Sequence, residues 1–330
     1  MFNTLLFVFI FLFFESISSE SLDSPKFEIK ENTISWEKWL NNLKIELKSL
    51  NLKSETVKNL NEIKFNSRVV ELDKKQPEFK LTFNQYLKKV ITPKRVKRGK
   101  LKFKENLALV KEIENKYQVS SFVIISLWGI ETSYGKNKGK FDVLNSLASL
   151  SYDGRRANFF LKELKHSLKI IDEGHISRKN LKGSWAGAFG HTQFMPSTFI
   201  NYAQDFDKDG KKDLLDNYSD ALASGAYYLS RMGWKNDVRW GEEIKDFVVD
   251  DQIFDLSKKK VYKNENFWKG MGIPIRNSYS TNKLRIVIPD KSVSEVFLVT
   301  SNFDVILNWN RSNYFALAVS ILSDALNEEE

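Results

Sequence analysis

Cysteine is absent from this chain of 330 residues. Its absence excludes disulfide bonds, Cys-ligated zinc, a thiol nucleophile and an N-terminal lipid-bearing cysteine. Histidine is scarce: only His166, His175 and His191 occur, and they form no His-Glu-x-x-His zinc motif. The sequence also lacks a Gly-x-Ser-x-Gly nucleophile elbow, a Walker A loop and a complete Gly-x-Gly-x-x-Gly fingerprint. The sequence therefore gives no support for a thiol enzyme, a serine hydrolase with a nucleophile elbow, a zinc protease or a nucleotide-binding protein.

A long apolar run occurs at the N-terminus, where Phe2 to Phe14 is almost unbroken and small residues follow from Ser16 to Ser19. The run is shorter than the about 20 residues of a membrane span, and its layout resembles a secretory signal peptide. We therefore expect a signal peptide over residues 1–19, a polar linker over 20–34, and a periplasmic protein that is not a lipoprotein. Because no Lys or Arg precedes the run, an uncleaved anchor is the alternative.

Composition indicates a folded chain with a sizeable core, since 42% of the residues are apolar and 13% are aromatic. The net charge is +9, from 51 basic and 42 acidic residues. Such an excess suits an anionic partner, which could be a cell-wall polymer, a nucleic acid or a membrane surface. A Lys-rich solvated surface explains the same charge without any partner.

Periodicity predicts an α+β, mostly α-helical protein. Apolar residues recur at helical spacing over 36–60 and 103–117, and further helices are predicted at 158–172, 196–202, 220–232 and 314–326. Short β-leaning runs follow Trp240, at 247–249, 285–288 and 296–299. We expect a helical domain over 35–235, a small β-containing subdomain over 236–308, and a C-terminal helix over 309–330 that returns to the helical domain.

Glu131 is the sharpest candidate for catalysis. Ser120 and Ser121 offer N-caps for a helix that begins near Phe122 and is apolar almost all round up to Ile130. Such a helix is usually buried, so Glu131 near its end would lose solvation and face the negative end of the helix dipole. Both effects raise the pKa of the carboxyl, as a general acid requires. The alternative is a structural ion pair with a neighbouring Arg or Lys.

A segment rich in small residues runs from Gly183 to Pro196. Small residues permit a close approach of the backbone to a ligand or to another helix. Ser184 and Gln193 add polar groups, while Trp185 and Phe194 add flat apolar surfaces, a combination that suits a sugar. A tightly packed turn without any ligand is the alternative.

The third feature is an acidic loop from Asp205 to Asp216 that matches an EF-hand at positions 1, 3, 5, 6, 9 and 12. Asp205, Asp207 and Asp209 are expected to bind a structural calcium ion, with Lys211 and Asp220 as further candidate ligands. Asp216 departs from the pattern, because a Glu usually supplies bidentate ligation at position 12. An acidic turn without metal is the alternative. We expect no cofactor for catalysis.

In this order the features resemble the membrane-bound lytic murein transglycosylase B family, over roughly residues 75–326. The matching segments are 92–96, 128–135, 183–196, 205–209, 220–228, 233–234 and 308–314. The resemblance implies a lysozyme-like α domain with a small β-rich subdomain. It also implies non-hydrolytic cleavage of the MurNAc–GlcNAc β-1,4 bond of peptidoglycan, which leaves 1,6-anhydroMurNAc ends. A lysozyme-type hydrolase and a non-catalytic glycan-binding scaffold are the alternatives.

The resemblance also implies roles for individual residues. Glu131 would be the acid/base, and Arg155 and Arg156 would approach anionic peptide or lactyl groups of the substrate. The residues expected to line the glycan cleft are Ser184, Gln193, Tyr228 and Asn310. Phe159, Trp309 and Phe315 stand where the family pattern leads us to expect Tyr, so the hydroxyl groups are lost there.

The expected partners follow from the same resemblance. They are peptidoglycan glycan strands and the machinery of cell-wall synthesis or division, with no nucleic acid. Membrane association is expected only through an uncleaved N-terminal segment.

Overall fold

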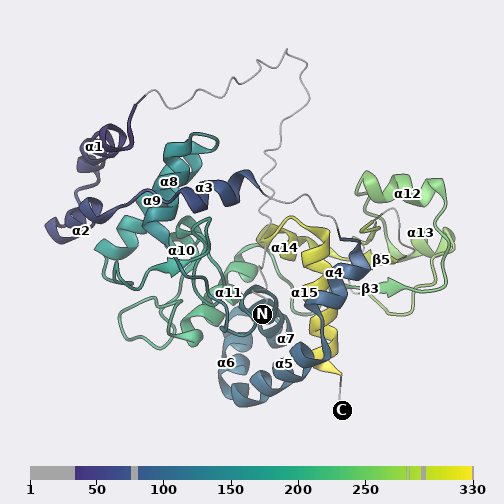
Figure 1. The fold of residues 1–330 in the computed structure, drawn as a ribbon. Coiled ribbons are helices and arrows are strands. Elements are labelled where there is room, and N and C mark those ends of the chain that lie inside the picture. The colour runs from purple at the N-terminus through teal and green to yellow at the C-terminus, as the bar shows by residue number, and fades with distance from the viewer. Residues whose placement is uncertain (1–33, 76–80, 280, 282, 291–294, 329–330) are drawn as a thin grey trace. The chain divides into compact units, whose positions relative to one another are not determined.

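A computed structural model describes residues 34–75, 81–279, 281, 283–290 and 295–328 (Figure 1). The expected signal peptide, and all of the expected linker except its last residue, lie outside these ranges. The described chain forms two compact units, one of residues 34–75 with 135–221 and the other of 81–134 with 222–328. In these ranges no helix combines the length and the apolar character needed to span a membrane.

The first unit is built around two helices, α8 and α9, which pack along each other (Figure 1). Asp142 begins α8 because its carboxylate accepts the Asn145 N–H at 2.9 Å. The helix α10 packs on α9, while α3 packs on α8 and α2 on α9. The elements are α1 Trp36–Leu47, η1 Lys48–Leu50, α2 Ser54–Lys58, η2 Asn59–Glu62, α3 Ser67–Lys74, β1 Phe141–Asp142, α8 Val143–Asp153, α9 Ala157–Asp172, β2 Lys182–Gly183 and α10 Pro196–Tyr202.

The second unit places α7 at its centre, packed against α5, α6 and α15. Its elements are α4 Phe83–Val90, α5 Pro93–Glu105, α6 Leu107–Tyr117, α7 Ser121–Thr132, β3 Gly241–Ile244, α12 Asp251–Lys258, α13 Glu265–Gly270, β4 Arg285–Val287, β5 Val296–Val299, α14 Ser301–Trp309 and α15 Asn313–Asn327. The helix α11, Tyr218–Arg231, begins in the first unit and continues in the second.

A small antiparallel sheet in the second unit has the strand order β3-β5-β4. The central strand β5 is apolar and wholly buried, as a strand covered on both faces should be. Its core is closed by α12 and α13, which contribute Ile253 and Trp268. The mostly helical α+β class predicted from the sequence is thus confirmed, while the domain boundaries stay a prediction.

Two details of the predicted elements were wrong. The run at 247–249 is not a strand: the strand lies at 241–244, and Asp246 ends it with a left-handed φ of 56°. Phe247 and Val249 still pack against the sheet core, whereas Val248 is 89% exposed. The predicted helix over 36–60 is interrupted after Leu50, where Asn51 also adopts a left-handed φ, of 49°; each part ends in a short 3-10 turn, η1 or η2.

Candidate active site

The end of α7 fixes the position of Glu131. Ser133 and Tyr134 both have left-handed φ angles, 55° and 60°, so the helix stops directly after Thr132. The Tyr134 N–H then donates to the Trp128 carbonyl at 3.1 Å, which closes the helix end. The Tyr134 hydroxyl donates to the Arg95 carbonyl of α5 at 3.0 Å. This end of α7 is therefore held rigidly, with Glu131 in its last turn.

The beginning of α7 differs in one respect from the prediction. Ser120 is the N-cap residue, but its hydroxyl makes no capping hydrogen bond. The Glu114 carboxylate of α6 takes over this task and accepts the Ser121 N–H at 3.2 Å and its hydroxyl at 3.1 Å. The predicted burial of the helix is confirmed.

The Glu131 carboxyl is buried, with 5% of the residue exposed. Its Oε1 accepts the Trp309 indole N–H at 2.8 Å, and its Oε2 has no hydrogen-bond partner among the residues that the structure describes. Burial raises the pKa of Glu131 to about 8, and the indole hydrogen bond opposes this rise. The carboxyl is therefore mainly protonated at neutral pH, as its sequence context predicted.

Within the second unit, Trp309, which donates to Glu131, is itself contacted by Tyr228 from a distant part of the chain. The ring of Tyr228 meets that of Trp309 edge-on, with centroids 5.2 Å apart, and its hydroxyl donates to the Asn308 carbonyl at 2.8 Å. Asn310 uses its Oδ1 to accept the Ser312 N–H at 3.1 Å. Tyr228 thus contacts Trp309, the residue that holds the Glu131 carboxyl, and Asn310 follows Trp309 in the chain. Both had been predicted to line the glycan cleft.

Tyr86 of α4 belongs to the same environment, and no local sequence pattern predicted it. Burial is the main reason that its pKa is raised, and the charge of Glu131 adds to the effect. The helix α4 packs on α15 (Figure 1), so the approach of Tyr86 arises from tertiary packing alone.

In the first unit, the small-residue segment folds into a tight loop that holds Ser184 and Gln193. The Ser184 hydroxyl accepts the Ala188 N–H at 3.0 Å. The Gln193 side chain is buried, and its amide nitrogen donates to the carbonyls of Lys138 at 3.1 Å and Gly190 at 2.9 Å. The segment is therefore a packed turn. The Ser184 O–H and the Gln193 amide oxygen have no other hydrogen-bond partner among the described residues and stay available to a ligand.

Arg155 and Arg156 share one buried carboxylate, that of Asp73 in α3, which sequence reasoning missed. Arg155 donates from Nε to Asp73 Oδ2 at 2.8 Å and from Nη2 to its backbone carbonyl at 3.0 Å, while Arg156 donates to Oδ1. Asp73 is 1% exposed, whereas the Arg155 side chain is 50% exposed. Two guanidinium groups are thus oriented by one carboxylate, and one positive charge remains in excess.

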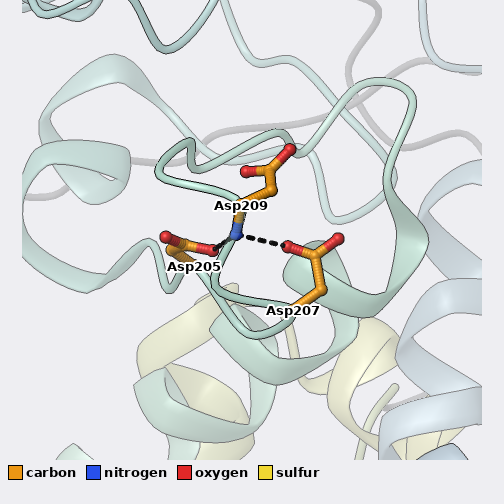
Figure 2. A group of neighbouring side chains, drawn as sticks. All are labelled: Asp205, Asp207 and Asp209. Atoms are coloured by element: carbon orange, nitrogen blue, oxygen red, sulfur yellow. Dashed lines mark hydrogen bonds between the residues drawn. The ribbon is translucent and has the colours of Figure 1, made fainter.

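The acidic loop brings three of its carboxylates together (Figure 2). One carboxylate oxygen each from Asp205, Asp207 and Asp209 lies within 4.8 Å of the others. The Asp209 N–H lies 3.1 Å from Asp205 Oδ1 and 3.3 Å from Asp207 Oδ1, and Gly210 turns the chain with a φ of 90°. This all-oxygen set of ligands fits a hard cation such as Ca²⁺.

Asp220 contributes to the loop in another way. It is fully buried, and its two oxygens accept the Phe206 N–H at 2.8 Å and the Asp213 N–H at 2.9 Å. Asp220 therefore braces both sides of the loop instead of joining the carboxylate cluster. Asp216, at position 12, lies 3.4 Å from the Lys138 ammonium.

Comparison with known proteins agrees with these features. The family profile described as "Transglycosylase SLT domain" matches residues 35–324. "Membrane-bound lytic murein transglycosylase B" of Escherichia coli (strain K12) is 30% identical over 256 residues, which cover 73% of this chain and 66% of that protein. The chain thus spans about two thirds of the length of this relative.

Solved structures show the same likeness. SltB3 from Pseudomonas aeruginosa, solved in complex with NAG-NAM-pentapeptide, has a TM-score of 0.85 and 33% identity, over 89% of this chain and 80% of that one. Escherichia coli Slt35, solved in complex with calcium, has a TM-score of 0.72 and 26% identity, over 88% and 92%. By sequence profile, sequence identity and fold, the chain belongs to the transglycosylase SLT domain family, in its membrane-bound lytic murein transglycosylase B group.

Proposed function

We propose that this protein is a lytic transglycosylase that cleaves the β-1,4 bond between MurNAc and GlcNAc in peptidoglycan. The observation that carries the proposal is the Glu131 carboxyl, which is buried, mainly protonated at neutral pH, and held through one oxygen only. A related enzyme, SltB3, has been solved with NAG-NAM-pentapeptide, a fragment of this polymer. That likeness supports peptidoglycan as the substrate.

In the first step, Glu131 donates the proton of its free oxygen to the glycosidic oxygen, and the bond from that oxygen to the anomeric carbon breaks. Glycosidases ordinarily supply a second carboxylate about 5–10 Å away as nucleophile or base. Within the described part of its own unit, no second carboxylate contributes to the raised pKa of Glu131. The 2-acetamido oxygen of MurNAc can instead bond to the anomeric carbon.

In the second step, the 6-hydroxyl of the same sugar attacks the anomeric carbon and displaces the acetamido oxygen. The Glu131 carboxylate accepts the hydroxyl proton, which returns the enzyme to its starting state. Attack within one sugar benefits from proximity, and the apolar surroundings of Glu131 disfavour entry of water. The product is a 1,6-anhydroMurNAc end.

The remaining candidate residues would bind the polymer. Arg155 and Arg156 carry excess positive charge toward solvent and suit peptide or lactyl carboxylates. Ser184, Gln193 and Asn310 offer hydroxyl and amide groups to sugar hydroxyls, and the Tyr228 ring offers an apolar face.

Release of fragments tests whether the protein is an enzyme or a glycan-binding scaffold. We expect the purified protein to solubilise muropeptides from insoluble peptidoglycan, with release that grows linearly with time and enzyme concentration. Binding to the pellet without any soluble product would identify a scaffold and reject the proposal.

We further propose that the Asp205–Asp209 loop binds a structural calcium ion, as its all-oxygen cluster suggests. Asp205, Asp207 and Asp209 would be ligands together with the backbone carbonyl of Lys211, at position 7 of the loop, and Asp220 would brace the loop. The ion would hold the loop in shape and would take no part in the reaction.

Calcium is therefore expected to raise the thermal unfolding midpoint by several degrees. A ligand that binds only the folded state at 100 times its Kd stabilises it by about 2.7 kcal/mol. Calorimetry with calcium and with a chelator measures the shift. Asp205→Asn/Asp207→Asn should abolish it, while Asp251→Asn, an exposed helix-start carboxylate outside the loop, should keep it. Equal midpoints with calcium and chelator would reject the site.

We propose a periplasmic location for the protein, since its substrate lies in the cell envelope and an E. coli relative is described as membrane-bound. Export would depend on the apolar N-terminal segment, which would also be the only means of membrane attachment. Machinery of cell-wall synthesis or division would be its protein partners.

A further inference from the structure

The contact between Trp309 and Glu131 has a chemical consequence beyond packing. The indole N–H of Trp309 donates to Glu131 Oε1 at 2.8 Å, while Oε2 has no partner in the described part of the chain. The two oxygens of the proposed acid/base are therefore not equivalent before any substrate binds.

An indole nitrogen donates a hydrogen bond but cannot accept one. A protonated carboxyl has one carbonyl-like oxygen, which accepts well, and one oxygen that carries the proton. Donation from Trp309 favours the form in which Oε1 is the carbonyl-like oxygen, so the proton resides on Oε2. The family pattern leads us to expect a tyrosine here. Its hydroxyl could donate or accept, so it would not determine which Glu131 oxygen carries the proton.

The position of Trp309 is itself fixed by its neighbours. It is the last residue of α14, and the preceding Asn308 carbonyl accepts the Tyr228 hydroxyl at 2.8 Å. The Tyr228 ring also contacts the indole edge-on, at an interplanar angle of 80°. These two contacts hold the indole N–H in line with the carboxyl at the end of α7.

We propose that Trp309 is a positioning residue that holds Oε1 of Glu131 as an acceptor and thereby keeps the transferable proton on Oε2. This inference rests on the acid/base role of Glu131 proposed above. Trp309 itself touches no reacting atom in this account.

Trp309→Phe tests the proposal because it removes the donor and keeps an aromatic ring. The indole hydrogen bond lowers the pKa of Glu131 against the stronger effect of burial. One N–H donated to a carboxylate shifts its pKa by roughly one unit. Without it, we expect the pKa of Glu131 to rise by about one unit from its value of about 8.

The acid form of Glu131 performs the first step, so kcat/KM must fall as pH rises through this pKa. The alkaline limb of the pH profile should therefore move upward by about one unit in Trp309→Phe. The other described titratable or charged groups near this end of α7 are Tyr86, Arg95, Arg98, Tyr134 and Tyr228. Burial raises the pKa of Tyr86 and of Tyr134 and lowers that of Arg95. Because a guanidinium group keeps its proton in proteins, we assign the alkaline limb to Glu131.

Infrared titration of the ligand-free protein gives a reading that is independent of the reaction. The carbonyl stretch of protonated Glu131, identified by subtracting the spectrum of Glu131→Gln, should persist to higher pH in Trp309→Phe than in the wild type. If the product proves hydrolytic, this titration still tests Trp309. If the titration does not move, the positioning role fails although the proposed function stands.

Trp240→Phe is the matched control within the same unit. Its indole N–H also donates to a carboxylate, that of Asp324, at 3.0 Å. This variant should leave both the alkaline limb and the Glu131 titration unchanged. Should Trp309→Phe not fold, Trp309→Tyr supplies a second test. Because a tyrosine hydroxyl donates only part of the time, the Glu131 titration midpoint should rise above the wild-type value, by less than the about one unit expected when no donor is present. A wild-type midpoint in every folded Trp309 variant would overturn the proposal.

Discussion

Replacing Glu131 by glutamine is expected to lower the rate of peptidoglycan cleavage by about 10²–10⁴-fold, the range typical of a lost general acid/base. The amide keeps the size of the side chain and can still accept the Trp309 N–H through its oxygen. It has no acidic proton to give and no carboxylate to receive one. Binding to insoluble peptidoglycan should therefore remain close to that of the wild type, as a pull-down assay would measure.

Glu163→Gln is a matched control for Glu131→Gln. Glu163 is also buried, with a raised pKa caused by burial, but its carboxylate accepts the N–H and hydroxyl of Ser197 at the start of α10. This variant should unfold at a lower temperature than the wild type. Below that unfolding midpoint, it should cleave peptidoglycan at the wild-type rate. A Glu131→Gln enzyme with more than about a tenth of wild-type rate would fall far short of the expected loss and reject the assignment.

Removing both arginines that face Asp73 is expected to destabilise the folded protein by about 3–5 kcal/mol. The double change Arg155→Ala/Arg156→Ala removes both guanidinium groups that donate to the Asp73 carboxylate, which is 1% exposed, and removing the partners of a buried charge is costly. Each single change should cost much less than half as much, because one guanidinium remains. Urea unfolding of the four proteins measures these differences.

A rescue experiment tests whether the loss of stability comes from the buried Asp73 charge or from the loss of the two arginine side chains themselves. Adding Asp73→Asn to the double variant removes the stranded charge and should restore part of the lost stability. Arg68→Ala, which breaks an exposed pair with Glu71, should cost no more than about 1 kcal/mol. A double variant as stable as Arg68→Ala would show that Asp73 does not depend on the two arginines.

The features that could be predicted from the sequence are those that depend on neighbouring residues. The apolar run before Glu131 is local, so burial of its helix and the raised pKa of the carboxyl followed from position alone. The Asp205–Asp209 cluster is local for the same reason, since Gly210 turns the loop within a few residues. The general helical class followed from periodicity in the same way.

The features that could not be predicted join residues that are far apart in the chain. Trp309 and Glu131 are separated by 178 positions and meet only after α14 and α7 have packed in one unit. Asp73 lies 82 positions before Arg155, and nothing in its local sequence marks it as a partner. The loss of a hydroxyl at position 309 was apparent from the sequence, but the indole N–H that contacts Glu131 in its place was not.

The mass of the released muropeptides tests the central claim most directly. If Glu131 works with the acetamido and 6-hydroxyl groups of MurNAc, digestion of purified peptidoglycan should yield 1,6-anhydroMurNAc ends, each lighter by one water than a hydrolysed end. Digestion in ¹⁸O-labelled water should leave these ends unlabelled, because no water enters the reaction. Labelled reducing ends as the dominant product would contradict the account and identify a lysozyme-type hydrolase.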